Sequence, residues 1–269
     1  MRYIVDNDLH IHTHLSTCSQ DENQTPENII KVQKANGFKT LCLTDHYWDD
    51  EVPCNTAVNW WYHEQNFEHI SNSLPLPLDD KVTLLFGCEA DLDSDNNIGV
   101  PKSRYDDFDF IIVSTTHFHH MAGKNWENCT NKDLAQHWIN RFDAVLNADL
   151  PFGKVGIAHL ACELINRKSR EDLLEVLDFI TDSELKRLFT KAAKLGLGIE
   201  LNVGDMRLMI AEPDRVLRIF KTAKDCGCKF YFGSDSHESH EFAGVKSVFE
   251  QAVDLLHLTE DDKFKINYK

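Results

Sequence analysis

The stretch "TDSELKRLFTKAAKLGLGIELNV", residues 181–203, reads as one helix followed directly by one strand. Thr181 and Glu184 have the spacing of a helix capping box, and Gly196 is a typical helix terminator. Apolar residues recur between them at helical spacing: Leu185, Leu188, Phe189, Ala192 and Leu195. The apolar run "GIELNV" then predicts a buried strand. A helix joined to a buried strand indicates a βα repeat and a parallel sheet.

The same pattern occurs on both sides of this stretch. Thr25 and Pro26 begin a helical segment that Gly37 ends, before a strand at 40–44. Residues 212–227 form another such segment, before a strand at 229–233. The buried strands expected in total are seven: 9–11, 40–44, 82–87, 110–115, 155–158, 198–203 and 229–233. This alternation predicts an α/β barrel, in which the carboxyl ends of all strands lie on one rim.

The chain of 269 residues shows no linker, repeat or low-complexity tract, so residues 1–269 are predicted to form a single domain. The formal net charge of −16 argues against nucleic acid and anionic membrane surfaces as partners. Apolar runs such as 110–113 are too short to span a bilayer, and the N-terminal segment lacks the apolar core of a signal peptide. We therefore expect a cytoplasmic protein whose eight cysteines are reduced; the sequence carries no signal for an oligomeric state.

Metal-ligand residue types follow nearly every predicted strand. In chain order they are His10 and His12, Asp45 and His46, Glu89 and Asp91, His117, His159, and Asp235 and His237. Any one of these alone is weak evidence, because a histidine after a strand is often a cap or turn residue. Six strand ends with the same feature, on one rim of a barrel, predict a metal centre.

The segment "DLHIHTH", residues 8–14, supports the same interpretation. Successive side chains of a strand alternate between its faces, so His10, His12 and His14 are expected on one side. Neutral imidazole is the commonest protein ligand for metals.

In this order, "DLHIHTH", "LTDH", "GCEAD", "TTHFHH", "IAHL" and "GSDSH" resemble the polymerase and histidinol phosphatase (PHP) superfamily of metal-dependent phosphoesterases. The resemblance extends from Asp8 to His237. It implies a distorted seven-stranded β/α barrel of the TIM-like kind, in agreement with the strands counted above. It also implies a centre of two or three divalent ions, for which zinc, manganese and iron are all compatible with the ligand types.

Position by position, the resemblance implies that His10, His12, Glu89 and Asp235 surround one ion. Glu89 would bridge to a second ion, held also by His117 and His159. His46 and His237 would serve a third ion, together with Cys18, which stands where many family members have a histidine. His14, His119 and His120 match no ligand position of the family and are expected at the surface or along a pocket.

Two arginines resemble the phosphate-binding residues of the histidinol-phosphatase branch. Arg167 follows His159 by eight residues in "IAHLACELINRK", and Arg207 lies in "ELNVGDMRLMI". A guanidinium group suits a phosphoryl group because it donates two parallel hydrogen bonds. In an acidic protein, cations beside the metals would also supply local attraction for an anionic substrate.

These residues predict a phosphomonoesterase in which a hydroxide bridging two metals attacks phosphorus and Glu89 holds the ions together. Asp235 or His237 would protonate the leaving alkoxide. L-Histidinol phosphate is the expected substrate, which would place the enzyme in histidine biosynthesis. The alternatives are another small phosphoester or nucleotide, or, from a different class, a non-catalytic metal-binding regulatory module. An amidohydrolase would present a lysine where this chain has Glu89.

The pocket walls are expected from loops 47–78 and 118–132. Within the first, the aromatic segment 59–67 could either line a pocket or pack as a helix on the barrel exterior. We favour the exterior, because aromatic side chains are more often core than recognition surface.

Overall fold

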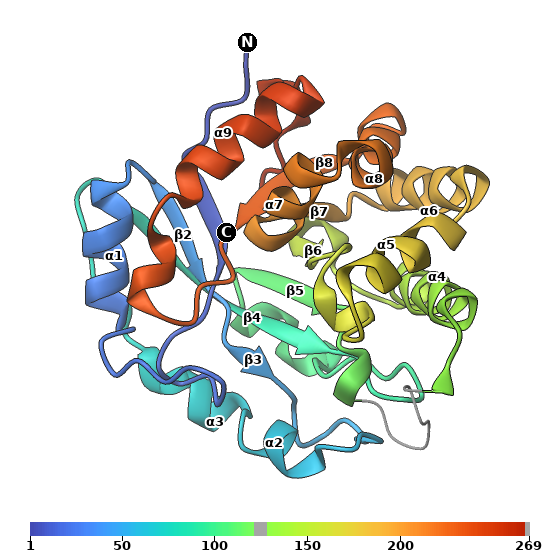
Figure 1. Ribbon diagram of the computed structural model, residues 1–269. Helices are drawn as coiled ribbons and strands as arrows, with labels where there is room; N and C mark the ends of the chain where they lie inside the picture. Colours follow the sequence, from blue (N-terminus) through green and yellow to red (C-terminus); the bar gives the residue numbers. More distant parts are fainter. Residues whose placement is uncertain (121–127, 267–269) are drawn as a thin grey trace.

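The computed structural model describes residues 1–120 and 128–266. It contains a nearly closed barrel of seven parallel strands with helices around it, which confirms the predicted TIM-like α/β barrel (Figure 1). The strands, in their order around the barrel, are β1 (Asn7–Ile11), β2 (Thr40–Leu43), β4 (Thr83–Asp91), β5 (Phe110–Ser114), β6 (Val155–Ile157), β7 (Gly198–Asn202) and β8 (Lys229–Gly233).

Helices connect these strands and cover the outside of the barrel (Figure 1). Their bounds are α1 (Pro26–Ala35), α2 (Asn59–His63), α3 (Phe67–Ile70), α4 (Asn131–Asn147), α5 (Arg170–Phe179), α6 (Asp182–Leu195), α7 (Val203–Ala211), α8 (Pro213–Asp225) and α9 (Val245–Leu256). Both predicted ends of α6 are confirmed. Thr181 caps its N-terminus by accepting a hydrogen bond from Glu184 N–H, and Gly196 ends it with a left-handed φ of 79°. None of these helices combines the length and apolar composition needed to cross a bilayer.

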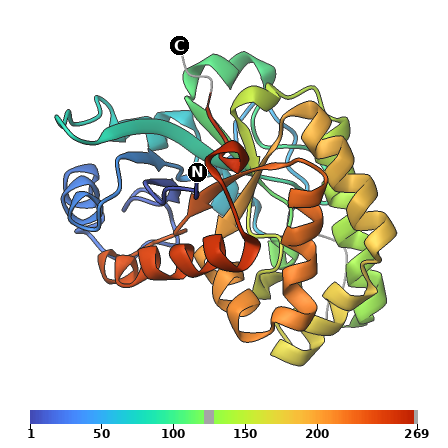
Figure 2. The ribbon, with the colours of Figure 1, turned by 90° about the horizontal axis from the view of Figure 1, so that it is seen from above.

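The barrel has one seam, between β1 and β8. Asp235 N–H donates to His10 O at 2.7 Å, and His12 N–H donates to Ser236 O at 3.1 Å. Below these bonds, the side chains of Asn7 and Asp8 accept from backbone N–H groups of β8. The N-terminal residues also pack beside α9 through the Arg2–Asp254 ion pair (Figure 2). The seam therefore brings residues about 225 positions apart into hydrogen-bonding contact.

Two separate apolar layers support the barrel. The larger lies between the strands and the helices around them. The smaller fills the barrel interior, because most of its residues lie on different strands of the barrel, joined by Ala158 directly after β6 and by Phe264 of the C-terminal segment. Its strand residues are Leu9, Cys42, Leu85, Phe110, Ile112 and Tyr231. All eight cysteines are free thiols, as expected.

The structure departs from the expected strands at one place that matters for function. A two-residue strand, β3 (His46–Tyr47), was not predicted, and it pairs in parallel with β4 so that His46 lies beside Glu89. Strand β4 also extends to Asp91, beyond the predicted end at residue 87. Glu89 is therefore a strand residue with backbone hydrogen bonds on both sides, not part of a loop after the strand.

Candidate metal centre

Four side chains converge at the carboxyl ends of β1, β4 and β8: the buried His10, His12 and Glu89, and the half-buried Asp235. The Nε2 atoms of His10 and His12 lie 3.1 Å apart. Glu89 Oε2 lies 3.5 Å from the first and 3.4 Å from the second. Asp235 Oδ1 lies 3.4 Å from His10 Nε2 and 3.1 Å from His12 Nε2. Ligand atoms about 2.1 Å from a tetrahedral zinc ion are about 3.4 Å from one another, so this set fits a single divalent ion.

A second set shares Glu89 with the first. Its other carboxylate oxygen, Oε1, lies 2.9 Å from His159 Nε2 and 4.0 Å from His117 Nε2. These three ligand atoms lie within 4.8 Å of one another and all three residues are buried. The two oxygens of Glu89 thus face two different groups of histidines, which is the arrangement of a carboxylate that bridges two metal ions.

His46 and His237 lie together on the other side of His12. The ligand atoms of His12, His46 and His237 form a third cluster within the same 4.8 Å limit. Cys18 belongs to none of the clusters found among the described residues, and it is exposed. Cys18 as a ligand therefore stays a prediction.

Two buried polar atoms in this region, His46 Nδ1 and Asp91 Oδ2, make no hydrogen bond to a residue of the described ranges. They lie 3.8 Å apart, and Glu89 Oε2 lies 3.0 Å from His46 Nδ1. Unsatisfied buried polar atoms are rare in proteins, and an ion is one ordinary explanation for them. Together with the spacing of the ligand atoms, this observation shows that the residues present fit divalent metals.

Each principal histidine is oriented by a hydrogen bond at its Nδ1 atom. The partners are Glu200 for His10 at 2.7 Å, Ser16 for His12 at 2.8 Å, Asp91 for His117 at 2.5 Å and Thr116 for His159 at 2.6 Å. Ser16 in turn donates to Asp45. These bonds leave Nε2 free to face the centre, and such partners fix the ring orientation of metal ligands. None of these four partners was predicted from the sequence to orient a ligand.

Two of the ligand residues have a strained backbone. His159 has a φ of 26° and Asp235 a φ of 54°, in the left-handed region that side-chain-bearing residues rarely adopt. Glu200 Oε2 accepts from His159 N–H at 2.7 Å, and the seam bond to His10 O holds Asp235 N–H. Backbone strain of this kind persists where the surroundings enforce it, and it is concentrated at functional sites.

The charges of the site balance one another in the absence of metal. Burial lowers the pKa of His12, but its hydrogen bonds to Asp235 and Glu89 outweigh burial and raise it to about 9. Burial also lowers the pKa of His10, but the negative charges of three neighbouring carboxylates outweigh burial and raise this pKa well above its usual value. Burial raises the pKa of Glu89, but His46 and His10 hold it well below its usual range. Protons on imidazoles thus occupy the place of metal cations.

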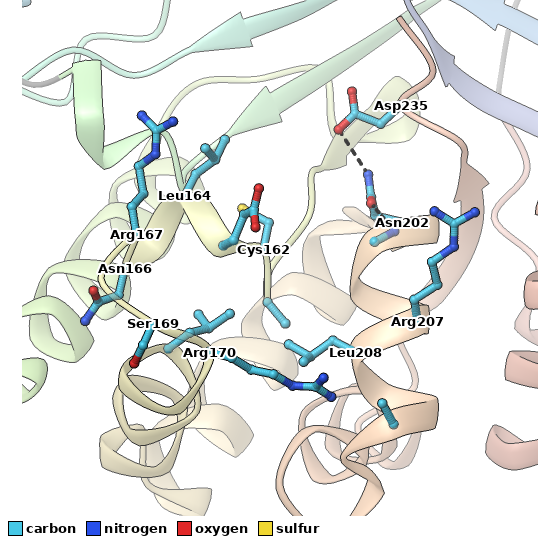
Figure 3. Close-up of a pocket in the computed structure, with 15 residues that line it drawn as sticks. Cys162, Leu164, Asn166, Arg167, Ser169, Arg170, Asn202, Arg207, Leu208 and Asp235 are labelled. Atoms are coloured by element: carbon cyan, nitrogen blue, oxygen red, sulfur yellow. Dashed lines mark hydrogen bonds between the residues drawn. The ribbon is translucent and has the colours of Figure 1, made fainter. Parts of the chain in front are cut away.

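A pocket of about 770 Å³ opens beside Asp235 (Figure 3). Arg167 and Arg207 both line it and extend from its opposite walls. Neither guanidinium has a hydrogen bond or ion pair to a residue in the described part of the chain. The third arginine of the lining, Arg170, pairs with Glu212 at 3.0 Å.

The predicted loops do not form this pocket: its walls are residues 161–173 and 202–211. Residues 121–127 of the second predicted loop lie outside the described residues.

The aromatic segment forms helix α2, as expected, but the favoured exterior position is wrong for Trp61. Its ring lies 4.7 Å from the ring of His46 and 4.8 Å from that of His120. Burial lowers the pKa of both His119 and His120 to about 3, so both rings are neutral at pH 7. These residues form a neutral aromatic wall beside His46. His14, in contrast, is exposed and does not join His10 and His12.

Fold and site together define a class of protein: α/β barrels that hold clustered histidines and carboxylates at the carboxyl rim of their strands. The sequence model of the PHP domain matches residues 8–204, which is more than half of the chain. The protein therefore belongs to the PHP domain family, as its motifs predicted.

Relatives and solved structures agree with this assignment. A probable phosphatase of Aliivibrio fischeri is 26% identical over 248 residues, covering 90% of this chain and 82% of the relative. One of Vibrio campbellii is 24% identical over 244 residues, covering 89% and 81%. The crystal structure of histidinol phosphate phosphatase from Lactococcus lactis, complexed with zinc, L-histidinol and phosphate, has a TM-score of 0.57 at 16% identity, covering 97% and 98% of the two chains. A putative histidinol phosphatase from Listeria monocytogenes also has a TM-score of 0.57, at 13% identity, covering 91% and 100%.

Proposed function

We propose that this protein is a metal-dependent phosphatase that hydrolyses a small phosphate monoester. The observation that carries the proposal is the position of Asp235. It belongs to the four-ligand set around His10 and His12, and it also lines the pocket that contains Arg167 and Arg207. A phosphoryl group beside Asp235 would therefore meet cations from both sides. The PHP family membership and the phosphatase relatives support the same reaction class.

The residues have distinct roles in this proposal. His10, His12, Glu89 and Asp235 would hold one ion, Glu89, His117 and His159 a second, and His46 and His237 a third. When bound, zinc, manganese or iron would supply a Lewis acid and would make a water acidic enough to lose its proton near pH 7. Glu89 would contribute to both of the first two sites, because its Oε2 faces His10 and His12 and its Oε1 faces His159 and His117.

Arg167 and Arg207 would bind the nonbridging oxygens of the phosphate and neutralise the charge that develops on them. Asp235 and His237 are the candidates to give a proton to the leaving oxygen. His237 Nδ1–H donates to Asp235 O at 2.9 Å, and its ring stacks on His12 with centroids 4.1 Å apart. His237 therefore lies beside Asp235, which lines the pocket.

L-Histidinol phosphate is the first substrate that we propose. Arg167 and Arg207 support this substrate, because they resemble the phosphate-binding arginines of the histidinol-phosphatase branch. The likeness to a histidinol phosphate phosphatase that was crystallised with L-histidinol and phosphate also supports it. That likeness concerns the fold, so the substrate depends on direct assay.

The test is hydrolysis of p-nitrophenyl phosphate with added manganese or zinc. Wild type is compared with Glu89→Ala and His117→Ala, and with Asp149→Ala, which removes only a surface ion pair to Lys102. Glu89→Ala and His117→Ala each remove a candidate metal ligand, so the transition state should lose several kcal/mol of charge stabilisation. We expect kcat/KM to fall by more than about 100-fold in these two variants and to stay unchanged in Asp149→Ala. A wild-type protein that binds metal but hydrolyses neither this ester nor a panel of natural phosphoesters would instead be a regulatory metal-binding module.

The substrate is tested separately on the same panel. We expect L-histidinol phosphate to give the highest kcat/KM. If its kcat/KM is no higher than that of other esters, the histidinol-phosphatase assignment fails while the phosphatase assignment stands.

A further inference from the structure

Glu200 is the middle residue of β7 and is fully buried between the two main groups of candidate metal ligands. Its Oε1 accepts from His10 Nδ1–H at 2.7 Å, and its Oε2 accepts from His159 N–H at 2.7 Å. His10 belongs to the first ligand set and His159 to the second. Both oxygens of this carboxylate are thus used, one for each set.

The other partners of the ligand histidines differ in this respect. Ser16, Asp91 and Thr116 each bind one ring at Nδ1. Ser16 also accepts from His46 N–H at 3.3 Å, but within the described residues none of these three side chains joins the first ligand set to the second. Glu200, in contrast, orients the ring of His10 in the first ligand set. It also holds the strained backbone of His159, with a φ of 26°, in the second ligand set. A shift of Glu200 would therefore displace ligands of two ions at once.

In the neighbouring strand β8, Gly233 leaves room for the Glu200 carboxylate because glycine has no side chain. A Cβ atom placed on Gly233 in β8 would lie 1.9 Å from Glu200 Oε1 and 2.6 Å from His10 Cβ. Glycine is thus the residue that permits the Glu200–His10 hydrogen bond. This is a second observation, independent of the bonds themselves, that the chain is built around the position of Glu200.

We propose that Glu200 is a positioning residue that couples the two metal sites. It fixes the tautomer of His10 with Nε2 free, strengthens that ring as a ligand through its negative charge, and sets the backbone position of His159. The proposal rests on the metal-dependent function proposed above and adds to it a single group on which both ions depend.

The experiment titrates metal-free protein with manganese chloride, using calorimetry for affinity and electron paramagnetic resonance for the ions. Two manganese ions bridged by Glu89 give an exchange-coupled spectrum, whereas separate ions do not. Glu200→Gln keeps the size of the side chain, but its amide nitrogen cannot accept one of the two hydrogen bonds. The matched control is Asp205→Asn. Asp205 is equally buried, and accepts from the backbone N–H of Ala161 rather than from a ligand residue.

We expect Glu200→Gln to weaken manganese binding by about 10- to 100-fold at both sites and to abolish the coupled spectrum, with an unchanged melting temperature of the metal-free protein. Gly233→Ala should cause the same loss, because it displaces the carboxylate without removing it. Asp205→Asn should retain the wild-type spectrum.

Wild-type affinity and coupling in both Glu200→Gln and Gly233→Ala would overturn the role of Glu200 and leave the metal centre intact. Weakened binding at the His10 site alone would also overturn it, because coupling requires both sites to change. A wild-type protein that binds no manganese, zinc or iron would instead overturn the proposed function, and the role of Glu200 with it.

Discussion

His10 and His12 face each other at a distance of 3.1 Å between their Nε2 atoms, in a site that excludes solvent. Their Nδ1 atoms are occupied by Glu200 and Ser16, so the two facing nitrogens can share only a proton or a cation. Two carboxylates, Glu89 and Asp235, lie within 3.5 Å of the same atoms. This relationship makes metal binding a competition between ions and protons.

Metal affinity should therefore rise with pH. The pKa of His12 is about 9 and that of His10 is well above its usual value, so both rings carry protons at pH 7 in the metal-free protein. An entering ion must displace them, and affinity increases as pH rises towards 9. Calorimetric titration with manganese in two buffers of different ionisation enthalpy measures the protons released. Release of no proton at pH 7 would contradict this charge assignment.

The stability of the metal-free protein should depend on pH through Asp205. Burial raises the pKa of this carboxyl to about 7, although His159 and the Ala161 N–H oppose burial. A folded-state pKa above the unfolded value means that stability is highest when the group is protonated, and is lost as pH rises from about 4 to 7. From pH 5 to pH 8, the free energy of unfolding of wild type should fall by about 2 to 3 kcal/mol relative to Asp205→Asn.

Urea unfolding of both proteins at the two pH values, with chelator present, measures this difference. Other titrating groups are common to both proteins and cancel in the comparison. Parallel pH profiles for wild type and Asp205→Asn would show that Asp205 is ionised in the folded protein at pH 5.

Removing either pocket arginine should weaken phosphate binding without loss of stability. Hydrogen bonds to charged groups contribute about 1.5 to 3 kcal/mol, so Arg167→Ala or Arg207→Ala should raise the inhibition constant of inorganic phosphate by about 10- to 150-fold. Within residues 1–120 and 128–266, neither guanidinium has a hydrogen bond or ion pair to lose. Arg187→Ala is the matched control, because its ion pairs with Asp143 and Glu184 lie away from the pocket. Equal inhibition constants in all four proteins would remove these arginines from the phosphate site.

The assignment of Cys18 to the third ion can be checked with cobalt. A thiolate ligand gives cobalt(II) an intense charge-transfer band in the near ultraviolet. We expect the cobalt-loaded protein to show this band and Cys18→Ser to lack it, whereas Cys54→Ser retains it. If wild type shows no such band, His46 and His237 hold the third ion without a thiolate.

Much of the site followed from local rules. The caps and apolar spacing of residues 181–196 predicted α6, and the runs that follow each helix predicted the seven strands. Ligand-type residues at strand ends were recognisable because parallel strands bring all their carboxyl ends to one rim. His10, Glu89, His159 and Asp235, which are spread over more than half of the chain, do meet there.

Only the tertiary structure decided which groups support these ligands. Glu200 is an ordinary acidic residue in the sequence, Asp91 was expected only as a ligand-type residue at a strand end, and β3 is too short for a periodic pattern. Their roles depend on hydrogen bonds such as Glu200 to His10, which joins residues 190 positions apart. Such bonds exist because the barrel closes between β1 and β8. Local propensity determines elements, but it carries no information on which distant side chains closure brings within 3 Å.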